Sequence, residues 1–161
     1  MRAWKVTIND LSPDSMPLAE LYRENFRQAR LALSKKCRVS GDTARPTLET
    51  DSFVEYVILD RNGEPVATAS IELLSEEDSA DLWFVEKSER MDPDYADDPD
   101  FQVETIFGGS RKEAQFEILR ALTRHTEQGC TFYPAFTHWD VYESEDSTTP
   151  AKYRYRLTQN P

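Results

Sequence analysis

Cysteine, histidine and long apolar runs are scarce in this sequence, and each scarcity argues against a class of protein. The two cysteines, Cys37 and Cys130, are too few for a disulfide framework, and no Cys-x-x-Cys pair is present. Two histidines without a cysteine cluster argue against a zinc site. No apolar stretch approaches the ~20 residues that a membrane-spanning helix needs. We therefore expect reduced thiols, no metal, and a cytoplasmic protein that does not cross a membrane.

Glycine-rich phosphate-binding motifs are also missing. The chain has five glycines and contains neither the P-loop pattern nor Gly-x-Gly-x-x-Gly. The adjacent Gly108 and Gly109 precede Ser110, and a helix N-terminus that follows glycines can hold an anion. A tight turn with an N-cap explains the same residues more simply. We keep Gly108, Gly109 and Ser110 as candidate anion-binding residues and expect no bound cofactor.

Acidic residues, by contrast, are abundant and concentrated. The chain carries a net charge of −11, and residues 72–104 contain thirteen acids against two bases, Lys87 and Arg90. This segment therefore accounts for the whole net charge. A concentrated negative field repels nucleic acid and anionic membranes, and it attracts basic protein surfaces. We expect a basic protein surface as the partner, and neither a nucleic acid nor a membrane as a direct one.

Hydrophobic periodicity predicts both helices and strands. One amphipathic helix is expected over residues 18–33, with Ser15 as its candidate N-cap. A second begins at a capping box of Ser110 and Glu113 and ends before Gly129. Loops are expected at 41–51, 75–79 and 88–100. Alternating or β-branched stretches predict strands at 4–8, 53–59, 65–74, 81–86, 101–107, 130–136 and 151–157, with 139–143 continuing the strand before it. The Asn62-Gly63 turn joins 53–59 and 65–74 as a hairpin, and 81–86 is expected as a third strand after it.

These elements predict a two-layer α+β sandwich in a single domain over residues 1–161. Its mostly antiparallel sheet would have about six to seven strands and two amphipathic helices. A ferredoxin-like core with an added hairpin fits the same order. No internal repeat is recognisable. The strand at 151–157 is expected at an exposed edge guarded by Lys and Arg, and residues 88–100 are expected to form an exposed acidic loop.

The acidic segment is the main functional candidate. Its carboxylates would occupy the basic groove with which a nucleic-acid-binding protein holds phosphates, as in an inhibitor, antagonist or immunity protein that mimics DNA. A solvated acidic face explains the same charges, and a calcium site is a sharper alternative, although the EF-hand order is absent. Tyr95 would be an aromatic anchor. The candidate partner-binding residues are Glu76, Glu77, Asp78, Asp92, Asp94, Tyr95, Asp97, Asp98 and Asp100.

A basic stripe is a second candidate surface. Arg23, Arg27 and Arg30 fall on one face of the predicted first helix. They would bind a phosphate or a carboxylate, or dock the acidic loop of a second copy. A solvated helix face is the simpler interpretation. Because an acidic loop and a basic stripe together favour self-association, an oligomeric structural or assembly subunit is a further hypothesis.

Three residues are candidate catalytic groups: Glu104, His138 and Asp140. His138 and Asp140 lie two residues apart in an expected strand, so their side chains share one face. A histidine beside a carboxylate suits a general base. The sequence assigns no nucleophile to this pair, and whether the chain is an enzyme stays open.

The element order over residues 1–140 resembles that of the GNAT acyltransferases. That order is strand, helix, hairpin, further strands, glycine-opened helix and strand. Where the family carries Arg/Gln-x-x-Gly-x-Gly/Ala around the acetyl-CoA pyrophosphate, residues 107–114 read FGGSRKEA and lack the motif. The resemblance implies a small-molecule transferase in which Gly108, Gly109 and Ser110 hold a phosphate and Glu104 or His138 acts as base.

Overall fold

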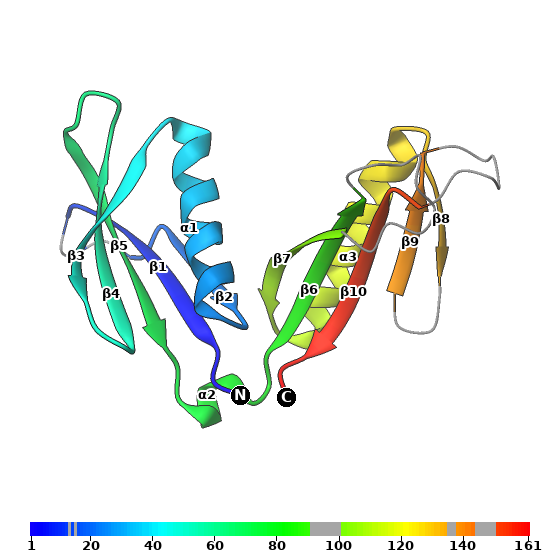
Figure 1. The fold of residues 1–161 in the computed structure, drawn as a ribbon, viewed down its shortest axis with the longest axis horizontal. Helices are drawn as coiled ribbons and strands as arrows, with labels where there is room; N and C mark the ends of the chain where they lie inside the picture. Colours follow the sequence, from blue (N-terminus) through cyan, green and yellow to red (C-terminus); the bar gives the residue numbers. More distant parts are fainter. Residues whose placement is uncertain (13, 15, 91–100, 135–137, 144–150) are drawn as a thin grey trace. The chain divides into compact units, whose positions relative to one another are not determined.

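The computed structural model describes residues 1–12, 14, 16–90, 101–134, 138–143 and 151–161. These residues form an α+β fold with two antiparallel sheets of five strands each and three helices (Figure 1). The chain divides into two compact units, which we call unit 1 (residues 1–81 and 160–161) and unit 2 (residues 82–159). The single sheet of six to seven strands predicted above is therefore replaced by two sheets. The single domain over residues 1–161 stays a prediction.

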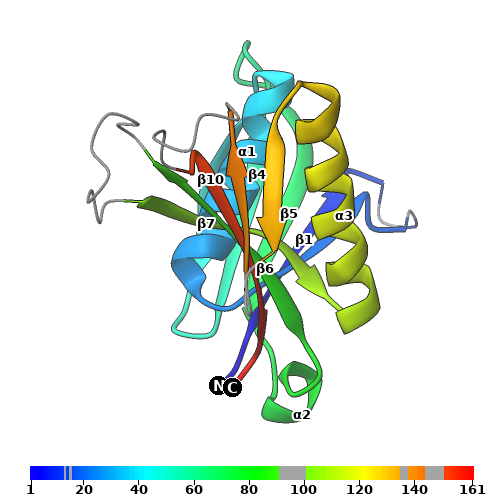
Figure 2. The same cartoon turned by 90° about the vertical axis from the view of Figure 1, so that its right-hand side faces the viewer.

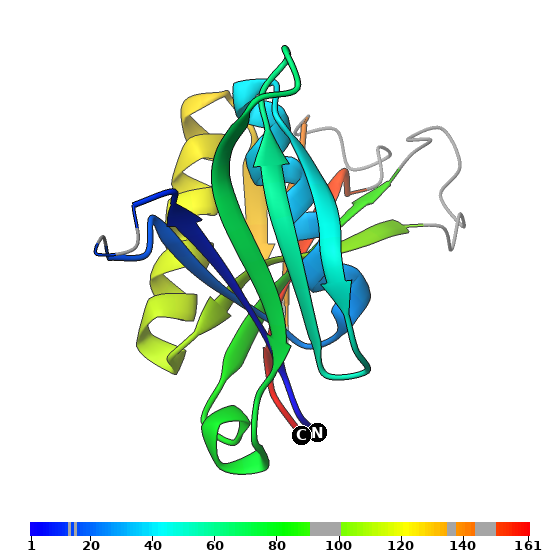
Figure 3. The same cartoon turned by 90° about the vertical axis from the view of Figure 1, so that its left-hand side faces the viewer.

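Unit 1 places one helix on one face of its sheet, and Figure 3 shows the sheet in front of that helix. Its elements are β1 (Trp4–Asp10), β2 (Ala19–Arg23), α1 (Phe26–Ser40), β3 (Thr43–Glu49), β4 (Phe53–Leu59) and β5 (Pro65–Leu73), followed by the short helix α2 (Glu76–Ser79). The strands lie in the order β2-β1-β5-β4-β3. The core comprises Val6, Ile8, Ala29, Leu33, Cys37, Val54, Tyr56, Ile58, Ala67, Ala69 and Ile71.

Unit 2 has the same layers, and Figure 2 shows its helix running beside its sheet. Its elements are β6 (Trp83–Arg90), β7 (Phe101–Gly109), α3 (Arg111–Glu127), β8 (Thr131–Pro134), β9 (His138–Tyr142) and β10 (Tyr153–Gln159). The strands lie in the order β7-β6-β10-β9-β8. The core comprises Val85, Ala114, Ile118, Ala121, Leu122, Val141 and Tyr155.

The two units repeat one topology. Each runs strand, strand, helix and three strands, and each sheet has its strands in the order second, first, fifth, fourth, third. The register agrees as well, because Trp4 pairs with Leu73 at the end of β5 and Trp83 pairs with Gln159 at the end of β10. The chain therefore contains an internal repeat, and the sequence-based expectation of none was wrong.

The helices of the two units share three buried positions, counted from their caps. Asn25 caps α1 by accepting a hydrogen bond from the Gln28 amide at 2.9 Å. Ser110 caps α3, where it forms the predicted capping box with Glu113. Apolar residues recur every four positions after each cap, which places them on the helix face that meets the sheet. The buried residues four, eight and twelve positions after the cap are Ala29, Leu33 and Cys37 in α1, and Ala114, Ile118 and Leu122 in α3.

Both helices end at a glycine in the left-handed conformation. Gly41 has φ 75° and Gly129 has φ 83°, a region that residues with a Cβ atom rarely adopt. Two residues later Thr43 and Thr131 begin β3 and β8. A proline follows three residues after each threonine, so both units carry Gly-x-Thr-x-x-Pro. This pattern is the sequence signal by which the repeat could have been recognised.

The predicted helix over 18–33 was wrong in its first half. Residues 19–23 form β2, which pairs with β1 from Trp4 to Ile8, and the helix begins at Phe26 and extends to Ser40. A short apolar run fits either period, and here pairing with β1 lets Ala19 and Leu21 pack on the unit 1 core. The expected loop 41–51 contains β3, an edge strand in which Pro46 needs no ladder donor.

Four other predictions need correction. The stretch expected as a third strand after the 53–74 hairpin is β6 and belongs to the second sheet. The stretch 139–143 does not continue the preceding strand, because β9 folds back antiparallel to β8. The last strand, β10, lies between β6 and β9 and is not an edge. The loop expected at 88–100 begins later, since β6 continues to Arg90, and residues 91–100 lie outside the described residues.

The two ends of the chain lie side by side in unit 1 (Figure 1). The Met1 ammonium group donates to the Pro161 carbonyl. The buried Asn160 side chain donates from Nδ2 to the carbonyls of Met1 and Ser79, the latter at 2.9 Å. The chain thus leaves unit 1 after Asp81 and returns to it at Asn160, so unit 2 is inserted into unit 1.

Candidate functional site

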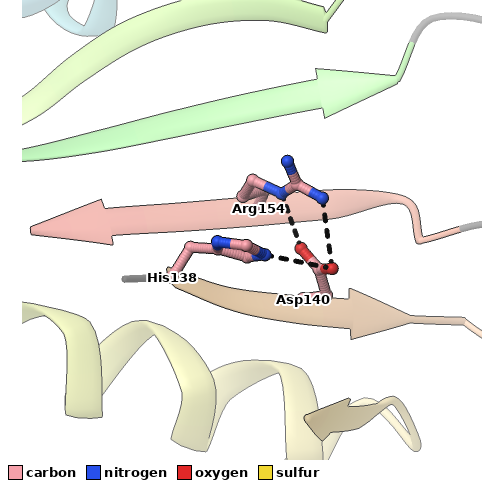
Figure 4. Close-up of polar contacts among 3 residues, drawn as sticks. All are labelled: His138, Asp140 and Arg154. Atoms are coloured by element: carbon pink, nitrogen blue, oxygen red, sulfur yellow. Dashed lines mark hydrogen bonds and ion pairs between the residues drawn. The ribbon is translucent and has the colours of Figure 1, made fainter. Parts of the chain in front are cut away.

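The sequence-predicted pair of His138 and Asp140 forms on the unit 2 sheet, and Arg154 joins it (Figure 4). Asp140 accepts two hydrogen bonds from Arg154, from Nε to Oδ1 at 2.8 Å and from Nη2 to Oδ2 at 3.3 Å. His138 Nε2 lies 3.5 Å from Asp140 Oδ2. The strands hold this arrangement, since Asp140 on β9 stands directly opposite Arg154 on β10.

Asp140 and Arg154 form an ion pair across the two strands. The side chains of His138, Asp140 and Arg154 are 20%, 16% and 35% exposed, so the pair is only partly desolvated. The hydrogen bond to Asp140 raises the pKa of Arg154 above its usual value. Both carboxylate oxygens of Asp140 are engaged by one guanidinium, a geometry that gives directional strength. The cluster therefore supports the register of β9 against β10, and a catalytic role for His138 stays a prediction.

A second cluster lies on the opposite, helix-covered side of the unit 2 sheet. A cavity of about 280 Å³ opens there between α3 and the strands. Its lining combines charged groups with a small apolar wall. The lining residues are Lys87, Ile106, Glu117, Ala121, Arg124, His125, Gln128 and Tyr155.

Polar groups in this cavity are already connected to one another. His125 Nε2 and the Tyr155 hydroxyl are 2.6 Å apart, and the His125 ring also lies 4.7 Å from the Tyr153 ring, centroid to centroid. The Lys87 ammonium group stands over the Tyr153 ring at 4.7 Å from its centroid, a cation–π contact. His125 Nδ1 is buried and has no hydrogen-bond partner. A buried nitrogen without a partner is uncommon and calls for an explanation.

The electrostatics of the cavity favour neutral forms of its histidine and tyrosine. Burial, followed by the charges of Lys87 and Arg124, lowers the pKa of His125 below 6.5, although Glu143 acts in the opposite direction. Burial raises the pKa of Tyr155 to about 12. The two groups therefore form a neutral hydrogen-bonded pair at pH 7, one donating to the other. Sequence reasoning missed this cavity, because the cavity forms only where particular residues of α3 pack against particular strands.

The candidate anion-binding residues do not come together as predicted. Arg23 belongs to β2, not to the first helix; it is buried, and its Nη1 donates to the Tyr22 carbonyl at 2.7 Å. Arg27 and Arg30 are exposed on α1. The three arginines therefore form no helix stripe, because the helix begins only after Asn25.

The glycine turn is also arranged differently from the prediction. Gly108 and Gly109 do not break the strand but are its last residues, opposite Phe84 and Trp83. The Ser110 amide donates to Glu113 Oε2 at 3.0 Å, so the side chain of the capping box occupies the place at which an anion would bind. Hydrogen bonding to Ser110 lowers the pKa of Glu113 accordingly.

The remaining candidates that the structure describes lie on two elements, β7 and α2. Glu104 lies on β7, opposite Lys87 on β6. Glu76, Glu77 and Asp78 are exposed in α2, where Ser75 caps them. The other partner-binding candidates, Asp92, Asp94, Tyr95, Asp97, Asp98 and Asp100, lie outside the described residues.

Comparison with protein-family models, with curated proteins and with solved structures finds no match for this chain. In the described part of the chain, no helix has the length and apolar character needed to cross a membrane. The same part contains no group of three His, Cys, Asp or Glu side chains arranged to hold a metal ion. The function must therefore be argued from the geometry and charge of the chain itself.

Proposed function

We propose that this chain is an acidic protein-binding module, of the inhibitor or antagonist kind, that engages a basic surface of a partner protein. One observation carries the proposal. β6 and β7 pair as far as Arg90 and Phe101, and the ten residues that join them carry five aspartates and no base. The corresponding connection in unit 1, residues 11–18, carries one acid, Asp14. The acid is therefore an addition to one copy of the repeat.

The charge density of this connection suits a surface that binds phosphates. Carboxylates at such density repel one another, and a basic groove that normally neutralises nucleic-acid phosphates relieves that repulsion. Binding of this kind is steered by long-range attraction and weakens as salt screens the charges. The partner class that this chemistry favours is a nucleic-acid-binding protein.

The acids of α2 support the proposal less strongly. Glu76, Glu77 and Asp78 are exposed, and among the described residues Glu76 and Glu77 have no ion-pair partner. Acids in the first turn of a helix are also favourable for the helix itself. Variants in the 91–100 connection therefore test the proposal more directly than variants in α2.

The test is capture of a partner from lysate by the immobilised chain at low and at high salt. We expect the wild type to capture a basic protein at low salt and to lose it at high salt. A variant with Asp92, Asp94, Asp97, Asp98 and Asp100 changed to Asn should capture none. Duplex DNA added as a competitor should displace the partner from the immobilised chain, because DNA and the acidic connection would compete for the same basic groove of the partner.

A matched variant controls for the loss of charge alone. It removes five acids of unit 1 instead, as Asp14→Asn, Glu49→Gln, Asp51→Asn, Glu55→Gln and Glu64→Gln, all at exposed positions. We expect this variant to capture the partner as the wild type does. Equal losses in both variants would mean that net charge, and not the β6–β7 connection, governs capture. Capture that persists in the Asp-to-Asn variant and at high salt would contradict the proposal.

Self-association is a second candidate, favoured by α1. All five of its charged residues are basic and exposed, whereas α3 at the same place in unit 2 carries three acids among its charges. A basic helix face on an acidic chain suits the acidic surface of a second copy.

Light scattering at low and high salt tests self-association, with a salt-sensitive dimer expected. A monomer at all concentrations and low salt would contradict it. The basic residues are Arg27, Arg30, Lys35, Lys36 and Arg38.

A further inference from the structure

We propose that the cavity between α3 and the sheet of unit 2 binds a small organic anion, with its carboxylate or phosphate head against Lys87 and Arg124. This site is independent of the proposed partner-binding function, because its lining lies between residues 87 and 155 and includes none of the acidic candidates. Three observations lead to it: a charged residue where the other repeat has an apolar one, the charge of the lining, and a buried nitrogen without a partner.

The internal repeat identifies the cavity as a departure from a common scaffold. In unit 1, Ile8 on β1 pairs with Ala69 on β5, and both lie in the apolar core. In unit 2 the same register position is held by Lys87 on β6 and Tyr155 on β10. The shared fold therefore tolerates an apolar pair at this place. Lys87 is only partly buried, but a charged side chain here replaces an apolar one, so the change points to a ligand of opposite charge.

The charge of the lining favours an anion. Two cations, Lys87 and Arg124, line the cavity, and among its described lining residues the one carboxylate is Glu117. Glu117 Oε2 already lies 3.4 Å from Arg120 Nη1, one turn along α3. Glu104 stands opposite Lys87 on β7 but does not line the cavity. With His125 neutral, the lining carries one net positive charge.

Hydrogen-bonding capacity remains for the head group. When the Tyr155 hydroxyl donates to His125 Nε2, the histidine proton resides on Nδ1, the buried nitrogen that has no partner. Anion oxygens accept from such a donor, as they do from ammonium and guanidinium groups. Ile106 and Ala121 provide an apolar wall for a carbon skeleton. The volume of about 280 Å³ is at the lower limit of ligand sites, which restricts the ligand to a small molecule.

The test uses three probes of similar shape and different charge on the full chain: benzoate, benzamide and benzylammonium. Phenyl phosphate and inorganic phosphate are added to compare head groups. Binding is measured as a rise in melting temperature and as chemical-shift changes of the His125 imidazole signals, because a ligand of the folded state must stabilise it. We expect benzoate and phenyl phosphate to bind, and benzamide and benzylammonium to leave both signals unchanged.

Two variants and one matched control locate the site. Lys87→Met keeps an unbranched side chain over the Tyr153 ring but removes the charge, and Arg124→Gln changes an exposed residue. Each should weaken benzoate binding about tenfold or more, as expected for loss of a charged hydrogen bond. Lys112→Gln removes the same charge at an exposed position of α3 outside the lining, and should leave affinity within about twofold.

Several results would overturn the inference. No response to either organic anion at millimolar concentration in the folded wild type would do so. Equal binding of benzylammonium would show that charge does not select the ligand. Equal losses in Lys112→Gln and Arg124→Gln would place the effect in the general field of α3. Retention of full affinity in Lys87→Met, with an unchanged melting temperature, would also exclude the proposed site.

Discussion

Trp4 and Trp83 occupy the same register position in two separate sheets, each opposite the last residue of the strand that pairs with it. The agreement extends through helix caps, buried helix positions and the glycine that ends each helix. Features that both units share belong to the scaffold. Features that one unit alone carries, such as the five aspartates of residues 91–100 or Lys87 beside Tyr155, are the candidates for function.

Leu33 and Ile118, both eight residues after their helix caps, should contribute similarly to stability. Each is buried, with 1% and 2% of its surface exposed. We expect Leu33→Ala and Ile118→Ala each to lower the free energy of unfolding by about 2–5 kcal/mol, because each leaves a cavity in a packed core. Urea titration measures both. Leu119→Ala, at a 59% exposed position on α3, should change it by less than about 0.5 kcal/mol.

The same two variants test the single-domain prediction. Unit 2 begins and ends within unit 1, and Asn160 ties the returning chain to Met1 and Ser79. We therefore expect one calorimetric transition, which both Leu33→Ala and Ile118→Ala move to lower temperature. Two transitions, each moved by only one of the variants, would show that the units unfold independently.

The helix caps provide a second matched pair. Asn25→Ala and Ser110→Ala each remove a side-chain acceptor from an amide of the first turn. We expect a loss of about 0.5–2 kcal/mol for each. Ser110→Asp, which restores an acceptor, should recover part of the loss. Ser110→Ala should also raise the pKa of Glu113 toward its usual value, a change that NMR titration detects and that a purely packing role for Ser110 would not produce.

Local signals predicted the elements that are self-contained along the chain. The 53–74 hairpin with its Asn62-Gly63 turn and the α3 helix with its capping box and Gly129 agree with the prediction. β2 could not be predicted, because its apolar spacing fits a helix equally and only pairing with β1 decides. The division into two sheets depends on long-range pairing of β10 with β6, about 70 residues apart, which no local pattern encodes.

The candidate site also combines a part that local sequence could predict with parts that depend on long-range strand pairing. The His138 and Asp140 pair was predictable from strand alternation alone. Its third member, Arg154, was not, because the register of β10 against β9 brings it there. The cavity was out of reach for the same reason, since Lys87, His125 and Tyr155 come from three elements.

The Asp140–Arg154 ion pair should stabilise the β9–β10 register modestly. We expect Asp140→Asn to lower the free energy of unfolding by about 1 kcal/mol, since Arg154 is 35% exposed and water replaces part of the interaction. In a double-mutant cycle, the free energies lost in Asp140→Asn and in Arg154→Gln should not add up to the loss in the double variant, because the two side chains interact.

The repeat also provides a replacement for this pair. In unit 1 the same register position holds Val57 opposite Thr68. Asp140→Val with Arg154→Thr should therefore be nearly neutral, because both partners are removed together. A double variant that loses more than the sum of the single losses would contradict this interpretation.

His125 should make stability depend on pH from its ordinary pKa of 6.5 downward. Its pKa is lower in the folded chain than the ordinary 6.5, chiefly because of burial and then of Lys87 and Arg124. Between the two pKa values the unfolded chain binds more protons than the folded one, so stability falls as the pH drops through 6.5 and the loss levels off below the folded pKa. Urea midpoints of the wild type and of His125→Gln, measured from pH 5 to 8, isolate this effect, because His138 is present in both and its contribution cancels. The difference between the two proteins should favour the wild type at pH 8 and shrink toward pH 5. A difference that stays constant over this range would mean that His125 titrates alike in both states, and that neither burial nor the charges of Lys87 and Arg124 lower its pKa in the folded chain.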